Sequence, residues 1–511
     1  MQLICRKAIK LVFYGMITFI VSLIALILGF TVYSRVAEKV FGPDDRPTPG
    51  VRKADGIDFI VLPPWRIFLI QFLNIAGTGP IFGAIMGMWY GPAAYVWIIL
   101  GCIFGGALHD YMNGMISLRN GGASLPQLTG HYLGNGARSL LLIVTVGLLL
   151  VAGVVFIYSP AIILASIWGD MMFWIVIIFC YYILATMLPI RKIIGRIYPF
   201  FGAAMLFMVV GLMVVLFIKQ PVLPEAWDSF SNWGAERFNM SGDLFPTLFV
   251  TLACGAVSGF HATQSPMMAR CLPNERMGRP IFYGAMITEG LVALVWCTVS
   301  NYFFFADGWR EVCSPDVIAQ FEAQSEKTLI QFFDAPMVVK IICTGWLGVV
   351  GSILALLGVV AAPITTGDTC FRSARLIFAE TFHVDQHAVL HRLYISLPLF
   401  AVALAMLVWQ ITSPDGFRTV WQYMGWGTQF LAAVSLWIST VYLASKHKFY
   451  WMTLVPALFM TVVCSTFIFV SPIAFGLPKA VAYSLTAIIS LGTIVEFIRW
   501  KRRLKYEELI D

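Results

Sequence analysis

Long apolar segments alternate with short polar connections along almost the whole chain. Each segment has about twenty residues, the length that an α-helix needs to cross the hydrocarbon core of a bilayer. Because lipid offers no partner to open peptide groups, such segments predict helices. Thirteen are predicted, at residues 10–33, 66–88, 92–118, 137–159, 171–189, 197–218, 244–262, 279–304, 336–362, 391–411, 418–443, 450–470 and 479–499.

The composition agrees with a chain that lipid surrounds. Of the 511 residues, 59% are hydrophobic and only 12% are charged, whereas a soluble domain carries about 25% charged residues. The net charge of +7 is spread between the apolar segments. It therefore indicates positive membrane edges and no nucleic-acid partner. The ten cysteines form no C-x-x-C pair, so the sequence predicts neither a zinc site nor a disulfide framework, and no cofactor.

The basic residues also predict the orientation of the chain. Most of them fall in connections on one side, together with the C-terminal stretch 499–505. Since cytoplasmic loops are rich in Lys and Arg, that side and the C-terminus are predicted to be cytoplasmic in a bacterial inner membrane. The acidic loops 219–243 and 305–335 would lie outside. An odd number of helices places the N-terminus outside. Its own basic residues favour the cytoplasmic side instead, so the location of the N-terminus is left open; they are Arg6, Lys7 and Lys10.

Two of the predicted helices contain residues that open a helix. The second contains Gly77-Thr78-Gly79-Pro80, and the seventh runs through Ser258-Gly259 to His261. Proline removes a backbone donor and disfavours helix at the residue before it. Glycines such as Gly83 can instead serve close helix packing. For the Gly-x-Gly-Pro stretch we predict an unwound segment.

The two interrupted helices are five apart in the order of the spans. Five is an odd number, so the second set of five enters the membrane from the opposite side. This spacing predicts an inverted five-plus-five repeat, an architecture that is common among secondary transporters. The predicted division is an N-terminal helix and cytoplasmic segment (1–65), the first repeat (66–218), the second repeat (244–443) and two C-terminal helices with a basic tail (450–511). The role of residues 34–65 stays open, although the Pro-rich stretch within them is typical of an ordered cap or a gate.

The unwound segments are the predicted substrate site. In transporters with broken helices, half-helix N-termini face anionic substrate groups, and opened carbonyls face a cation or proton. The predicted substrate-binding residues are Gly77, Thr78, Gly79, Ser258, Gly259, His261 and Gln264.

Ionisable residues inside the spans are costly there and are candidates for ion coupling. His109 and Asp110 in the third span and Glu289 in the eighth are predicted to carry a proton. Asp368, expected just after the ninth helix, could instead form a fixed ion pair or helix cap. Hydroxyl oxygens could ligate sodium in place of a proton; they belong to Thr365 and Thr366.

Five stretches, in order along most of the chain, resemble the carbon starvation protein A family of bacterial transporters. They are Ile75–Pro80, Phe104–Asp110, Ala253–Ser265, Gly367–Arg375 and Trp421–Trp426. The resemblance implies a proton-coupled importer of pyruvate or small peptides, used when preferred carbon runs short. It also implies the amino acid–polyamine–cation superfamily fold. This chain is shorter than many members and has Thr78 where the family often has a smaller residue.

Three other classes of protein are alternatives. A channel would need a continuous polar stripe, and these spans show isolated polar points. An intramembrane enzyme could use His109-Asp110 or His261 as a base, but the chain lacks a recognisable nucleophile motif. A sensor would need a ligand domain larger than the loop 305–335. The sequence leaves open pyruvate or peptide as substrate, proton or sodium as coupling ion, and the oligomeric state.

Overall fold

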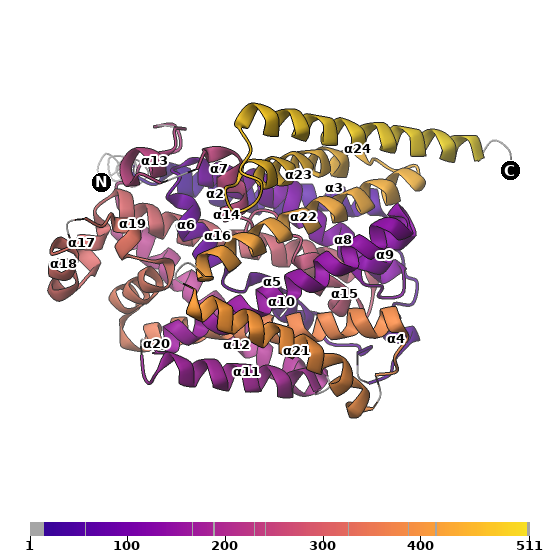
Figure 1. The fold of residues 1–511 in the computed structure, drawn as a ribbon, viewed down its shortest axis with the longest axis horizontal. Helices are drawn as coiled ribbons and strands as arrows, with labels where there is room; N and C mark the ends of the chain where they lie inside the picture. The colour runs from indigo at the N-terminus through magenta and orange to yellow at the C-terminus, as the bar shows by residue number, and fades with distance from the viewer. Residues whose placement is uncertain are drawn as a thin grey trace, which may run out of the picture.

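The computed structural model describes residues 15–507, apart from 57, 166, 188–189, 229, 241, 325, 387 and 414–415. Every regular element in that part of the chain is a helix (Figure 1). Ten of the described helices are long and apolar enough to cross a membrane, or eleven if one sharply bent pair counts as a single span. The predicted fold class, an all-α polytopic membrane protein, is therefore confirmed.

Nine of the predicted spans coincide with helices of spanning length. Some of these pass through a short π-helical stretch and continue beyond it as the same span. They are α2–α3 (Ile17–Phe41), α7–α8 (Ala93–Arg119), α10 (Asn135–Ala165), α12 (Ile190–Lys219), η4–α16 (Glu275–Phe305), α21 (Val389–Thr412), α22 (Gly416–Ser445), α23 (Trp451–Val470) and α24 (Lys479–Glu507).

The other four predicted segments depart from a simple span. The second is the bent pair: α5 (Pro64–Ala76) and the stretch Gly79–Met88, at 53° to each other. The fifth, α11 (Met171–Met187), has 17 residues. The seventh consists of two short helices, α14 (Leu244–Thr251) and α15 (His261–Ala269). Eleven of the thirteen predicted segments therefore contain a helix of spanning length or the bent pair, whereas the fifth is shorter and the seventh is broken.

The ninth segment, α20 (Ala335–Phe382), is longer than predicted. Its backbone is interrupted at Gly348, where φ is +65°, a conformation that glycine adopts without steric cost. The helix then continues to Phe382, twenty residues beyond the predicted end. Asp368 was expected just after this helix, and that was wrong. The residue lies inside the helix and is fully buried.

The loops gather by charge at the two ends of the bundle. Figure 1 shows α13 (Trp233–Phe238) and α18 (Pro315–Glu322), which belong to the two acidic loops, at one end. The basic end of α24 lies at the other end, near α9 (Leu125–Leu133). Gly15 accepts a hydrogen bond from the Leu223 amide of the first acidic loop at 2.9 Å. The described chain thus begins at the acidic end. Arg6, Lys7 and Lys10 lie outside the described residues, and the side that faces the cytoplasm stays a prediction, as does the division into repeats.

The Pro-rich stretch after α3 is held against the basic end of the bundle. The Thr48 hydroxyl donates to the Leu272 carbonyl at 2.5 Å, and the Asp44 amide donates to Glu275 at 3.0 Å. Arg119, at the end of α8, donates to the Gly42 carbonyl at 2.7 Å. These contacts make the stretch an ordered cover over the ends of α8 and α15.

Candidate substrate and coupling site

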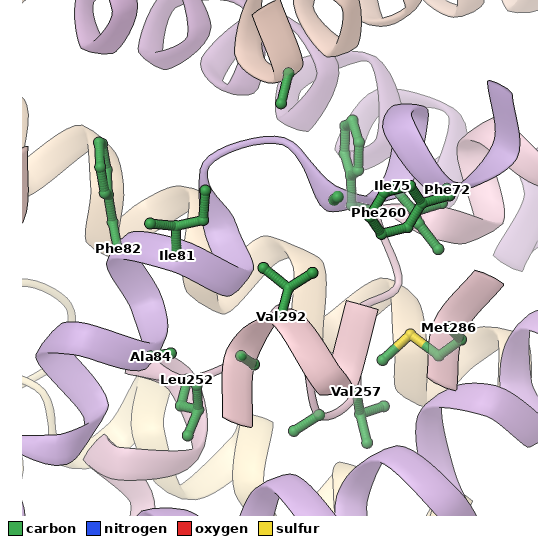
Figure 2. Packing of buried hydrophobic residues seen from close by; sticks show 14 of the residues in the cluster. Phe72, Ile75, Ile81, Phe82, Ala84, Leu252, Val257, Phe260, Met286 and Val292 are labelled. Atoms are coloured by element: carbon green, nitrogen blue, oxygen red, sulfur yellow. The ribbon is translucent and has the colours of Figure 1, made fainter. Parts of the chain in front are cut away.

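The helix formed by α5 ends where the sequence predicted an opening. Gly77 has φ +46° and ψ −142°, and the chain resumes a helical course only at Gly79. Figure 2 shows this stretch as an open loop between Ile75 and Ile81. The end of the helix frees the Leu73 carbonyl, which lies 3.1 Å from the Thr366 hydroxyl of α20. A side chain of a distant helix thus satisfies one of the backbone groups that the break exposes.

The second break runs from Leu252 to Phe260, between α14 and α15. Gly255 has φ +87°, and its amide donates to Glu289 Oε1 at 3.1 Å. The Gly259 amide donates to the Thr428 carbonyl of α22 at 2.9 Å. A Cβ on Gly259 would lie 2.0 Å from the Ala432 nitrogen, so only glycine fits. Two amides of this break are therefore bonded to two other helices, α16 and α22.

The two breaks touch each other. A Cβ added to Gly79 would lie 2.3 Å from Cys254 Sγ. Around them, Figure 2 shows Leu252 below Ala84 and Phe260 beside Ile75. The predicted substrate residues Gly77, Gly79, Ser258 and Gly259 therefore belong to one region. Thr78 and Ser258 are fully buried.

Four fully buried ionisable side chains form a continuous chain beside the second break. Asp110 Oδ1 lies 2.8 Å from His109 Nδ1, and Asp110 Oδ2 lies 2.9 Å from His261 Nδ1. The other ring nitrogen of His261, Nε2, lies 3.2 Å from Glu289 Oε2. Asp110 comes from α8, His261 from α15 and Glu289 from α16. Sequence analysis selected all four residues but did not predict that they meet.

The contacts determine where protons must be. An ionised Asp110 accepts from both Nδ1 atoms, so each imidazole carries its proton on that nitrogen. Nε2 of His261 is then a bare acceptor that faces a carboxylate oxygen. One further proton is needed between His261 and Glu289, on either group, to make that contact favourable. With Asp110 ionised, the contact between His261 and Glu289 therefore has room for one shared proton, and both side chains are fully buried.

Three side chains of this region also offer donor atoms for a metal ion. Cys254, His261 and Glu289 each bring one ligand atom, and these atoms lie within 4.8 Å of one another. Thiolate, imidazole and carboxylate suit a transition metal. However, Glu289 Oε1 already accepts the Gly255 amide, and Oε2 faces His261. One shared proton accounts for these contacts without an ion.

One polar residue in the first break was missed by the sequence analysis. Asn74 lies in the last turn of α5 and is fully buried, and neither polar atom of its amide has a hydrogen-bond partner among the described residues. The same holds for Thr78 Oγ1 and Gln264 Oε1. An asparagine in an apolar helix, three residues before Gly-x-Gly-Pro, was the signal that could have identified it. Buried polar atoms without partners are costly, so these side chains are suited to contact a bound molecule.

The predicted free N–H groups of the half-helices are occupied. The amides of His261 and Ala262 at the start of α15 donate to carbonyls three residues earlier, at 3.3 and 3.1 Å. The amides of Ile81 and Phe82 both donate to the Thr78 carbonyl. Side chains, and not these amides at the helix N-termini, therefore offer the polar atoms that have no partner among the described residues.

Asp368 and Thr365 belong to a separate cluster between α12 and α20. The Tyr198 hydroxyl donates to Asp368 Oδ2 at 2.6 Å, and Arg372 lies 3.7 Å from Oδ1. The Thr365 hydroxyl lies 2.9 Å from the Ala361 carbonyl of its own helix. This geometry is that of the fixed ion pair that sequence analysis gave as the alternative for Asp368.

A pocket of about 520 Å³ leads from the acidic end toward the second break. It reaches Thr251, the last residue of α14, and is also lined by Thr419 and Gln422 of α22. On the same helix, the Trp421 ring packs against Phe82 with 6.2 Å between ring centroids. The pocket is therefore a candidate entrance to the region of the broken segments.

Two broken helices that meet at a buried polar site, in a helical membrane protein, are the architecture of a membrane transporter. The fold of solved transporters agrees. The manganese transporter of Eremococcus coleocola shares a TM-score of 0.53 at 13% identity, over 88% of this chain and 99% of that one. The sequence model described as carbon starvation protein CstA matches residues 14–172 and 157–467, so the chain belongs to that family.

Several relatives of this chain carry names. The Bacillus subtilis protein named peptide transporter CstA is 25% identical over 88% of this chain and 90% of its own length. Its Escherichia coli namesake is 24% identical over 84% of this chain and 76% of its own length. A Haemophilus influenzae protein named only as an uncharacterized membrane protein is 43% identical over 57% of this chain and 91% of its own length. The chain is a membrane transporter and not an enzyme.

Proposed function

We propose that this protein is a proton-coupled importer of a small carboxylate nutrient, pyruvate or a small peptide, used under carbon starvation. The observation that carries the proposal is the position of Glu289. One of its oxygens accepts the Gly255 amide of the broken segment, and the other faces His261, which contacts Asp110. A proton site and a substrate-binding segment therefore share one carboxylate.

This sharing supplies a coupling mechanism. An ionised carboxylate is a stronger hydrogen-bond acceptor than a protonated one. Loss of the proton shared with His261 therefore tightens the hold of Glu289 on the Gly255 amide, and gain of the proton relaxes it. His109 and Asp110 extend the relay away from the break. Since Gly255 lies in the unwound stretch, the protonation state changes the backbone that contacts the substrate.

The substrate side rests on Asn74, Thr78 and Gln264. The Asn74 amide can donate to a carboxylate oxygen and accept from an N–H group. Glycines at 77, 79 and 259 allow the two backbones to approach, and the serine at 258 adds a hydroxyl. A small molecule with a carboxylate suits this mixture of donors and acceptors. The name of the Bacillus subtilis and Escherichia coli relatives favours a peptide, and the family resemblance allows pyruvate.

The test is uptake of labelled pyruvate, and separately of a labelled dipeptide, into proteoliposomes with and without an inward proton gradient. We expect the wild type to accumulate one of the two only with the gradient. Glu289→Gln should lose accumulation but keep exchange of labelled for unlabelled substrate, because exchange needs no net proton movement. Glu311→Gln, a change of the same kind in an exposed loop, should behave as wild type. Gradient-driven accumulation by Glu289→Gln would overturn the role of Glu289.

A second experiment tests the substrate contacts. Asn74→Ala should raise the KM for uptake at least tenfold and leave the proton dependence unchanged. Asn301→Ala is the matched control, because Asn301 is also buried but donates to the Pro224 carbonyl outside the site. An unchanged KM in Asn74→Ala would remove this residue from the substrate site.

Sodium coupling is the second candidate. The Thr366 hydroxyl lies 3.1 Å from the freed Leu73 carbonyl, and hydroxyl and carbonyl oxygens are ligands of hard cations. If sodium drives uptake, an inward sodium gradient should support accumulation at equal pH on both sides, and Thr366→Val should abolish it. Uptake that ignores sodium would reject this candidate.

A further inference from the structure

A pocket of about 670 Å³ lies between α23 and α24 at the basic end of the bundle. It is far in the sequence from both broken helices. Its deeper part is apolar, with Leu454 and Leu458 on one wall and Ile494 on the other. Figure 1 shows α24 along the outer edge of the bundle. Only 11% of the residues in its most apolar stretch are buried inside the protein. Lipid therefore has direct access to this pocket.

The mouth of the pocket carries positive charge next to aromatic rings. Lys501 and Arg502 line it together with Tyr450 and Phe497. The Lys501 ammonium donates to the Tyr450 hydroxyl at 2.9 Å and lies 4.4 Å from the centre of that ring. Tyrosine and tryptophan side chains are typical of the headgroup level of a membrane. Among the described residues that line the pocket, none is acidic.

We propose that this pocket binds an anionic phospholipid, with one acyl chain along the apolar walls and the phosphate at Lys501 and Arg502. In a bilayer, an apolar groove open to lipid is occupied by acyl chains. The basic residues at its mouth then select the headgroup, because Lys and Arg near the membrane surface attract anionic lipids. A free phosphate would use only the mouth and leave the apolar walls without a partner.

The lipid also has a structural task. α24 meets the rest of the protein mainly through α23, and the Phe497 ring packs against Tyr450 with 5.5 Å between centroids. An acyl chain between the two helices extends this contact toward the membrane interior, and the phosphate offsets the repulsion between the two adjacent cations. The bound lipid therefore fastens α24 to the bundle.

The experiment is native mass spectrometry of the delipidated full chain, titrated with phosphatidylglycerol and with phosphatidylcholine of the same acyl chains. We expect phosphatidylglycerol to bind at least tenfold more tightly. The double variant Lys501→Gln/Arg502→Gln should bind both lipids equally. The control Arg499→Gln/Arg503→Gln removes the same charge from residues of the same helix that do not line the pocket, and it should keep the preference. Leu454→Trp, which fills the apolar part, should weaken both lipids.

Three outcomes would overturn the proposal. They are equal binding of the two lipids by the wild type, an equal loss of preference in the control variant, and displacement of phosphatidylglycerol by millimolar inorganic phosphate. Loss of preference in the control variant would mean that the basic helix attracts anionic lipids without a specific site. Displacement by phosphate would mean that the site binds free anions. If the double variant does not fold, the wild-type lipid comparison and the phosphate competition still decide.

Discussion

Arg119 and Glu275 form a two-point ion pair at the basic end of the bundle. Arg119 Nε lies 3.1 Å from Glu275 Oε1, and Nη2 lies 3.0 Å from Oε2. Glu275 is fully buried, and Arg119 is 12% exposed. The same guanidinium donates to the Tyr442 hydroxyl and the Gly42 carbonyl. One arginine therefore joins α8, α22, the stretch before α16 and the cover that follows α3.

Glu275→Gln should lower the stability of the protein strongly. Removing one partner of a buried ion pair leaves an uncompensated charge and costs about 3 to 5 kcal/mol. The neighbouring Arg276 pairs with Asp45, but both side chains are more than half exposed, so Arg276→Gln should leave the melting temperature unchanged. Thermal unfolding of the two variants in the same detergent checks this. Equal melting temperatures would mean that the buried pair contributes little.

Gly259→Ala should prevent the second break from closing against α22. Its Cβ would meet backbone atoms of Ala432 and Leu431 at 2.0 and 2.4 Å, and backbone cannot turn away as a side chain can. The control is Gly147→Ala in α10, where a Cβ meets nothing within 4 Å. Alanine there should stabilise the helix by about 1 kcal/mol. Yield and melting temperature after purification measure both effects, and a stable Gly259→Ala protein would contradict the packing.

The contact between the two breaks predicts a compensating pair of substitutions. Gly79→Ala should impair folding and transport, since its Cβ would lie 2.3 Å from Cys254 Sγ and 2.4 Å from Cys254 Cβ. Cys254→Gly removes both atoms and leaves only the Cα, at 3.9 Å. The double variant should therefore recover much of the stability that Gly79→Ala loses. A double-mutant cycle of melting temperatures gives the coupling. Additive losses would show that the breaks pack independently.

The cover after α3 should loosen in acid. The Arg276 guanidinium holds the pKa of Asp45 below its usual value, and Arg46 does the same for Asp44. A carboxyl whose pKa is lower in the folded state stabilises that state above its unfolded pKa. This contribution disappears as pH falls through the folded value. Hydrogen exchange of residues 42–53 should show protection that falls below about pH 4. Asp45→Asn should show weaker protection already at pH 7, and equal protection in both proteins would contradict the prediction.

The sequence allowed prediction of the helical class and of both breaks because each depends on local chemistry. Apolar length predicts a span, and Gly77-Thr78-Gly79-Pro80 cannot continue a regular helix. The end of α20 was missed for a different reason. Asp368, Arg372 and Arg375 suggested a polar connection, but Tyr198 and Arg372 satisfy Asp368 inside the protein. Hydropathy does not contain that tertiary information.

The candidate site was predictable as a set of residues but not as an arrangement. Asp110, His261 and Glu289 were each selected because ionisable groups are costly in a span. Their contacts join helices separated by 151 and 28 positions in the sequence, and no local pattern encodes such pairings. Asn74 was missed because a single amide in an apolar helix resembles any other isolated polar residue. The structure adds that this amide is buried and has no hydrogen-bond partner among the described residues.

The bond between the Gly259 amide and the Thr428 carbonyl has a consequence for biogenesis. The two residues are 169 positions apart, so the ribosome must make three further membrane helices before the partner of this peptide group exists. Until then the two short helices α14 and α15 cannot span the lipid stably, because peptide groups in the stretch between them lack hydrogen-bond partners. The nascent chain must therefore keep this region in contact with water or with the insertion machinery until α22 arrives. Assembly of the candidate site is consequently a late event in synthesis.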